Sequence, residues 1–347
     1  MVQTMKINKL PAPTFGWLGM NEAGVEKFNA HRICPAEEIP PEICVGREDA
    51  ANMHIASGCG DEFDAFITRC VPRNTVYAIP AGKKASGAVR LTYRFACGMY
   101  QADSVRLDLG KGSGMTVIMD CVTGEEQVGK AALRTRITAG AYSHLTLVQI
   151  IRIGQGCTLV NDIAADADDH AKIDVIHIFL SGASVYQGMR TSLYGYQSEC
   201  TVRAAYTVTD DHSLDMNYVV DHYGNKSVSN MKFDGTLRGT SSKILRATID
   251  FKNGCAGSVG DETEDALLMD DTVKNKTIPL ILCAEEDVAG NHGATIGRLD
   301  ENLLFYLASR GMEEREIYKM LELSRIAAVI AEIPDEKMRD ELLAGMK

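Results

Sequence analysis

Between residues 66 and 251 the chain consists of short runs in which apolar and polar residues alternate, separated by Gly, Asp, Asn and Ser. Alternation with a period of two indicates β-strands with one buried face. No helical pattern of ordinary length lies between the runs, which excludes alternating βαβ units. The pattern therefore predicts an all-β core with strands at 104–109, 115–122, 133–138, 145–153, 173–180, 201–208, 214–220 and 245–251.

Three all-β architectures are compatible with these strands. A sandwich and a barrel bury the apolar face of each strand within stacked or closed sheets. A parallel β-helix buries it by stacking each coil on the next. The sequence shows no clean repeat that separates these possibilities, and the calcium-binding glycine-rich repeat is absent. The strand pattern alone leaves the architecture open.

The two ends of the chain differ from this middle part. Residues 1–62 hold most of the prolines and one short helical candidate at 22–28, so we expect a small irregular segment there. Beyond residue 298 the apolar residues recur with the helical period, and Asp300 and Gly311 fit an N-cap and a C′ residue. We therefore expect an irregular segment at 1–62, a β core at 63–298 and a helical domain at 299–347.

Composition narrows the functional class. Of the 347 residues, 45% are hydrophobic and 24% are charged, which is typical of a globular chain. The net charge is −11 and no long Lys/Arg run is present, which argues against a nucleic-acid partner. The ten cysteines form no CxxC pair, and no stretch resembles a secretion signal or a membrane span. We therefore expect a cytoplasmic protein with free thiols and no membrane partner.

Two glycine-rich segments invite comparison with nucleotide-binding loops. In residues 109–114 the lysine is followed by glycine, which does not fit a P-loop, so a turn between strands is expected. Residues 290–297 lack the GxGxxG spacing of a dinucleotide site. His292 lies within the second segment, where flanking glycines would leave its imidazole accessible.

A longer motif surrounds His292. Residues 277–312 read TIPLILCAEEDVAGNHGATIGRLDENLLFYLASRGM, and they closely resemble the C-terminal signature of the SufB/SufD family. Members of this family are scaffold subunits of the SUF machinery for iron–sulfur cluster assembly. Upstream, HYGNKSVSN at 222–230 and FDGTL at 233–237 resemble a second family marker, and LPAPTFGWL at 10–18 is similar to a third. The resemblance thus extends over most of the chain.

The resemblance implies a mainly β fold, a right-handed parallel β-helix of the SufBD type followed by a C-terminal α-helical domain. It also implies partners. Family members pair through their β-helices, SufB with SufD or as homodimers, and bind the ATPase SufC through the C-terminal helices. ATP chemistry would then belong to the partner, and no catalytic residue is expected here. The residues of the implied docking surface are Leu303, Leu304, Tyr306, Leu307, Ile317 and Leu321.

A ligand for iron or for a transient iron–sulfur cluster is implied as well, with no permanently bound cofactor. His292 matches a histidine that SufD-type chains place at the subunit interface. Gly290 and Glu264 stand where SufD-type and SufB-type chains, respectively, carry a cysteine, so the chain is closer to SufD. Cys283 and Cys255 lie near the motif and are the expected additional ligands, because thiolates and imidazoles suit iron.

The expected function is that of a SufD-like, non-catalytic scaffold that pairs with a SufB-type subunit or with itself and binds a SufC-type ATPase. One alternative is a β-helix enzyme acting on polysaccharide, in which Asp166 and Asp169 would act on the sugar. The acidic run that holds them, which also includes Asp162 and Asp168, is more typical of a solvated loop. A second alternative is a metal-free structural dimer.

Overall fold

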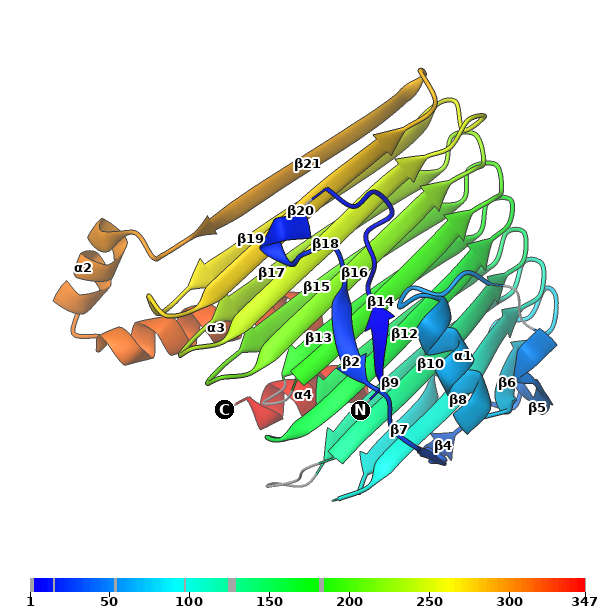
Figure 1. The fold of residues 1–347 in the computed structure, drawn as a ribbon, viewed down its shortest axis with the longest axis horizontal. Helices are drawn as coiled ribbons and strands as arrows, with labels where there is room; N and C mark the ends of the chain where they lie inside the picture. The colour runs from blue at the N-terminus through cyan, green and yellow to red at the C-terminus, as the bar shows by residue number, and fades with distance from the viewer. Residues whose placement is uncertain are drawn as a thin grey trace.

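The computed structural model describes residues 3–14, 16–52, 55–96, 98–123, 129–180 and 184–346. Its main body is a parallel β-solenoid in which the chain passes alternately between two facing sheets (Figure 1). Even-numbered strands from β6 to β20 form most of one sheet, and odd-numbered strands from β7 to β21 form most of the other. Neighbours within each of these series are parallel. The expected parallel β-helix is therefore confirmed.

Each of the eight strands expected from the sequence lies on one strand of the solenoid. The first sheet contains β5 (Cys44–Asp49), β6 (Arg73–Ile79), β8 (Tyr100–Leu109), β10 (Gly129–Ala139), β12 (Cys157–Ala167), β14 (Ser184–Leu193), β16 (Ser213–His222), β18 (Ser242–Phe251) and β20 (Lys274–Cys283), with β3 (His31–Arg32) beside β8. The second sheet contains β4 (Ala36–Glu38), β7 (Val89–Phe95), β9 (Gly114–Thr123), β11 (His144–Arg152), β13 (Lys172–Leu180), β15 (Glu199–Val208), β17 (Val228–Leu237), β19 (Ser258–Leu268) and β21 (Val288–Gly297).

The length of one coil varies along the solenoid, and this is why the sequence shows no repeat. The coil that runs from Ala131 to its register partner Leu159 is longer than the next one, from Leu159 to Val185. Near the C-terminal end, the coil from Ser242 to its partner Lys274 is longer than either. Stacking requires the strands to stay in register, whereas the connecting turns tolerate insertions.

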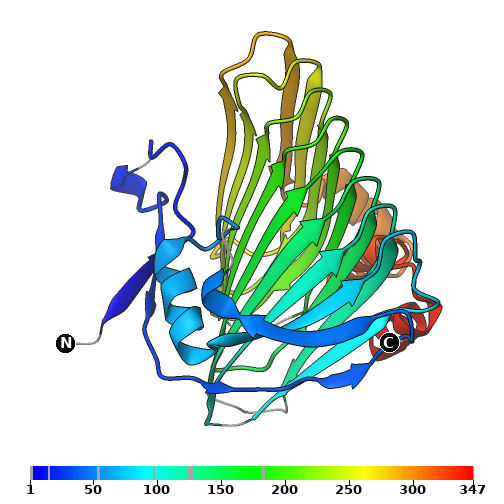
Figure 2. The same ribbon diagram turned by 90° about the vertical axis from the view of Figure 1, so that its right-hand side faces the viewer.

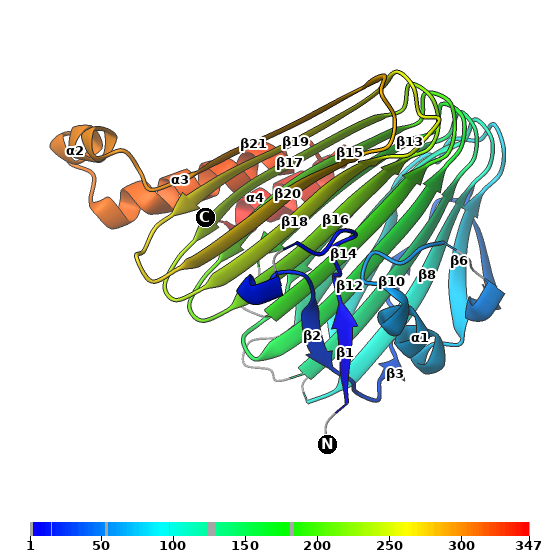
Figure 3. The ribbon, with the colours of Figure 1, turned by 45° about the horizontal axis from the view of Figure 1, so that its top comes forward.

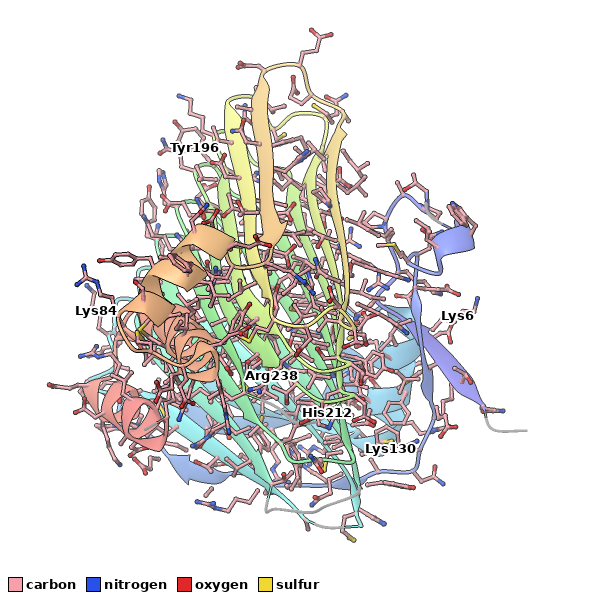
Figure 4. The ribbon with its side chains drawn as sticks, turned by 90° about the vertical axis from the view of Figure 1, so that its left-hand side faces the viewer. Lys6, Lys84, Lys130, Tyr196, His212 and Arg238 are labelled. Carbon is pink, nitrogen blue, oxygen red and sulfur yellow. The ribbon has the colours of Figure 1, made fainter. Side chains whose placement is uncertain are left out.

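The turns that lead from the first sheet to the second are also stacked. Gly112, Tyr142 and His170 occupy equivalent turn positions with positive φ, and each donates its backbone N–H to the turn of the next coil. The segment at 109–114 is thus a turn between β8 and β9, as expected. The rings of Tyr142 and His170 stack at a centroid distance of 4.6 Å. Tyr196, at the next turn (Figure 4), approaches the His170 ring edge-on at 5.4 Å. These contacts offset the cost, about 1–2 kcal/mol per residue, of a left-handed conformation outside glycine.

The N-terminal segment covers the outer face of the first sheet. It contains β1 (Thr4–Ile7), η1 (Gly16–Leu18), β2 (Ala23–Glu26), η2 (Ala50–Asn52) and α1 (Asp61–Cys70). Phe63, Phe66 and Ile67 of α1 are buried against outward-facing residues of β8, β10 and β12. The helix expected at 22–28 is wrong: these residues include β2, which pairs antiparallel with β1 and buries Val25. Strand pairing and burial outweigh the local helical pattern.

The C-terminal helices cover the outer face of the second sheet, opposite the N-terminal segment (Figure 2). They are α2 (Glu301–Ser309), α3 (Glu314–Ile330) and α4 (Glu336–Gly345). The Asp300 side chain accepts hydrogen bonds from the first turn of α2, which confirms the expected N-cap. Apolar residues of α3 and α4, including Ile326, Ile330 and Leu342, pack with Val148 and Ile178 of the sheet.

Candidate functional site: the open last coil

The solenoid ends at an uncovered coil. In the part of the chain that the structure describes, β20 and β21 are each the last strand of a sheet and pair on one side only. Their inward-facing apolar residues remain accessible, with Ile281 half-buried and Ile296 exposed. The backbone N–H and C=O groups that point outward along such an edge are a template for pairing with another strand.

His292 lies in the middle of β21, and its register partner on β19 is Glu262. Partners on neighbouring parallel strands point to the same face of the sheet. Glu262 is only 3% exposed and points between the two sheets, so His292 also points toward the interior, at its open end. Because no further coil covers it, His292 itself is exposed. The structure thus places an accessible imidazole beside a buried carboxyl group.

A buried polar network lies beneath this position. Lys243 forms an ion pair with Glu264, and neither side chain is exposed. Glu264 also accepts hydrogen bonds from the hydroxyls of Tyr206, at 2.8 Å, and Thr277, at 2.6 Å. Burial, with the nearby charge of Glu264, raises the pKa of Glu262 to about 8, although Lys243 acts in the opposite direction. Glu262 is therefore a protonated carboxyl group at neutral pH that a bound cation would deprotonate.

The two expected cysteine ligands lie at the turns of the last two coils. Cys283 ends β20, next to the turn, and its thiol donates to the backbone carbonyl of Glu285 at 3.0 Å. Cys255 lies in the preceding turn and is buried, which raises the pKa of its thiol, as does the nearby Cys283. The structure brings the two cysteines together at the turn, whereas His292 lies in the middle of its strand.

The expected docking residues on the C-terminal helices fall into two groups. On α2, Leu303 and Tyr306 are exposed, and Phe305 between them is 75% exposed. On α3, Ile317 is fully buried and Leu321 is half-buried. Helix α2 protrudes beyond the body of the solenoid (Figure 1), so its apolar side chains have little of the chain's own surface to pack against.

The acidic run is a solvated turn at Asp168 and Asp169, as the sequence indicates, but its first two members lie in a strand. Asp162 lies within β12, is fully buried and forms an ion pair with Arg136 at 2.7 Å. Asp166 is a strand residue as well, and burial raises its pKa. Asp169 lies in a turn, where its carboxylate accepts a hydrogen bond from the backbone N–H of Tyr196 at 2.7 Å. These carboxylates therefore have structural partners.

The residues that sequence reasoning missed are the buried ones. Glu262, Lys243 and Tyr206 come from three different strands and meet only because successive coils stack. The only available signal was a polar residue at an inward position of a strand, as at Glu262 and Glu264. Alternation within a single strand cannot show that such a residue has a partner one coil away.

The family of the chain follows from its similarity to known proteins. A parallel β-solenoid with an open, histidine-bearing last coil belongs to the class of solenoid proteins, which bind partners over extended surfaces. Residues 94–324 match the family model described as the SufBD core domain of the SUF system for FeS cluster assembly. The chain therefore belongs to the SufBD family, and the resemblance of its motifs to that family is confirmed.

Two similar relatives are named iron-sulfur cluster assembly protein SufD. The one from Bacillus subtilis (strain 168) is 21% identical over 67% of this chain and 50% of its own length. The one from Escherichia coli (strain K12) is 25% identical over 69% of this chain and 56% of its own length. A SufBD family protein from Mycobacterium tuberculosis is 31% identical over 37% of this chain and 15% of its own length. The chain spans about half the length of the two SufD relatives.

Across the described ranges, no helix combines the length and the apolar character that a bilayer span requires.

Proposed function

We propose that this chain is a non-catalytic scaffold for iron–sulfur cluster assembly, which pairs through its open last coil and holds iron or a nascent cluster as cargo at His292. The observation that supports the proposal most directly is the position of His292 at the centre of β21, an edge strand that pairs on one side only among the described residues. Membership of the SufBD family supports the same role. The proposal places the protein in the cytoplasm, where thiols such as Cys283 stay reduced.

The geometry of the last coil favours a two-fold pair. In antiparallel pairing, directly opposed residues point to the same face of the sheet. A two-fold axis perpendicular to the sheet must therefore lie between two copies of the same residue, which face each other across it. An axis perpendicular to the sheets through His292 also passes through Pro279, because the two lie equally far from the turn that joins β20 to β21. Both strands can therefore pair with their own copies about one axis. A SufB-type subunit with the same ending would pair in a similar way.

This arrangement would complete a ligand set that one chain lacks. Within the described ranges of a single chain, no three His, Cys, Asp or Glu side chains gather as a metal site. Across the axis, the two His292 residues would have Cβ atoms about 5 Å apart, with a Glu262 behind each. Two imidazoles and two carboxylates suit ferrous iron, and sulfide would complete a cluster. Cys283 and Cys255 would supply thiolates at the turn.

The proposal is tested by anaerobic iron binding to the purified chain and its variants. We expect the wild-type protein to sediment as a dimer and to take up ferrous iron, and cluster absorption to develop when ferric iron and sulfide are then added. His292→Ala should remain dimeric and lose most of this uptake. Asp211→Asn, an exposed acidic residue in the turn between β15 and β16, serves as the control. Full iron and cluster uptake by His292→Ala would contradict the cargo site at His292, and a dimeric wild type that takes up no iron would leave the metal-free dimer.

We further propose that α2 binds a SufC-type ATPase. Truncating the chain at Gly297 is a poor test, because it would uncover the sheet residues that α3 and α4 bury. Phe305→Ser and Leu303→Ser instead remove exposed apolar groups without disturbing that packing. We expect both variants to lose binding to the ATPase from the same genome, whereas Leu343→Ser on α4 should retain it. Unchanged binding by the α2 variants would refute this contact.

A further inference from the structure

Trp17 is the only tryptophan of the chain, and it is exposed. It belongs to the short helix η1, and 88% of the residue is accessible to solvent. Its neighbour Leu18 is 37% exposed. A single exposed apolar residue needs no explanation, but a large aromatic residue of this kind is the side chain most enriched at the energetic centres of interfaces.

The loop that carries Trp17 is fixed to the open end of the solenoid (Figure 3). Lys276, on β20, donates from its ammonium group to the backbone carbonyl of Leu18 at 3.0 Å. Arg246, on β18, donates from its Nε to the carbonyl of Met20 at 2.5 Å. Met20 is buried and packs with Ile278 on the outer face of β20. Trp17 is thus held beside the edge strand by contacts of Leu18 and Met20, at the end of η1 and just after it.

We infer that Trp17 contacts the outer face of a second copy's β20 when the two last coils pair. This inference rests on the proposed pairing. With the axis through Pro279, Lys276 lies directly opposite the partner's Leu282, which is half-buried in the single chain. Since the carbonyl of Leu18 accepts a hydrogen bond from Lys276, the adjacent Trp17 would lie within reach of the second copy's Leu282.

The charges along β20 also suit a second copy of the same chain. The strand begins near the exposed cation Lys274 and is followed by the exposed anion Glu286. Antiparallel pairing about the middle of the strand brings the basic beginning of one copy toward the acidic end of the other. Each interface would contain this contact twice, because a two-fold interface repeats every residue pair.

The experiment uses the tryptophan as its own probe. Full-length protein is diluted across its dimer–monomer transition, which is followed by analytical ultracentrifugation, while Trp17 emission and acrylamide quenching are measured. We expect the dimer to show emission at shorter wavelength and several-fold weaker quenching than the monomer. Trp17→Ala should raise the dimer dissociation constant by about thirtyfold, the scale of an interface anchor. Val45→Ala, an exposed residue on β5 at the other end of the solenoid, should leave the constant unchanged.

Two other outcomes have different meanings. A dimer in which Trp17 stays fully quenchable, and whose dissociation constant is unaffected by Trp17→Ala, overturns the inference and leaves the proposed pairing intact. A chain that stays monomeric at every concentration overturns both, because there is then no second copy for Trp17 to contact.

Discussion

Glu262 and His292 are register partners on the last two strands of the second sheet, one buried and the other exposed. Glu262 lies in the interior of the solenoid, and His292 lies next to it at the open end. Burial and the charge of Glu264 keep Glu262 protonated at neutral pH, so the group beside His292 can release a proton when a cation binds. Iron uptake should accordingly release protons and strengthen as the pH rises.

The raised pKa of Glu262 predicts a specific dependence of stability on pH. A carboxyl group with a pKa of about 8 in the folded chain, against an ordinary 4.5, contributes stability that is complete below pH 4.5 and is lost as the pH rises through 8. In that window the free energy of unfolding should fall by up to about 1.4 kcal/mol per pH unit through this group. Glu262→Gln should flatten this slope in urea titrations at several pH values, and an unchanged slope would contradict the assignment.

Breaking the Lys243–Glu264 ion pair should cost much more than replacing it. Both side chains are fully buried, and burial lowers the pKa of Lys243. Lys243→Met leaves the Glu264 carboxylate without its counter-charge, and we expect a loss of about 3–5 kcal/mol of unfolding free energy. The double variant Lys243→Met, Glu264→Leu should recover most of that loss. Chemical denaturation of the three proteins measures the difference, and a double variant no more stable than the single one would refute this account.

Gly188 allows the N-terminal segment to lie against β14. A Cβ atom there would stand 2.5 Å from the backbone nitrogen of Cys59 and 2.6 Å from its sulfur. Gly188→Ala should therefore push residues 57–60 away and destabilise the chain by about 1–3 kcal/mol. Hydrogen exchange should rise in the N-terminal segment while the later coils stay protected. Gly46→Ala, where a Cβ meets no atom within 4 Å, is the matched control.

The individual strands and helices could be predicted from the sequence more reliably than the way in which they stack. Alternation predicted strands such as β8 and β18, and Asp300 marked the start of α2, because these signals are local. The solenoid itself came from the resemblance, since coils of unequal length hide the period that stacking would otherwise show. The helix predicted around Val25 was wrong because that short segment pairs with β1 as a strand and buries Val25.

The candidate site was predictable only at its accessible residue. His292 stood out because glycine-rich sequence surrounds it and because it matches a family motif. Its neighbour Glu262 lies one coil earlier, and only the register of β19 and β21 brings the two together. Cys283 and His292 are close in sequence, yet Cys283 lies at the end of β20 beside the turn, whereas His292 lies in the middle of β21. In a solenoid, distance along the chain is a poor guide to distance in space, because neighbours come from the next coil.

The packing of the C-terminal helices on the sheet leads to a last prediction. Ile330 of α3 is fully buried in the cluster that joins the helices to the sheet, whereas Met320 on the same helix is 41% exposed. Ile330→Ala should lower the unfolding free energy by about 2–5 kcal/mol, since it leaves a cavity at that junction. Met320→Ala should change it by less than about 0.5 kcal/mol. If thermal denaturation of Ile330→Ala shows the helices melting before an unchanged solenoid, the helices are a separate unit; a single transition at lower temperature means that they stabilise the solenoid directly, which is the result we expect.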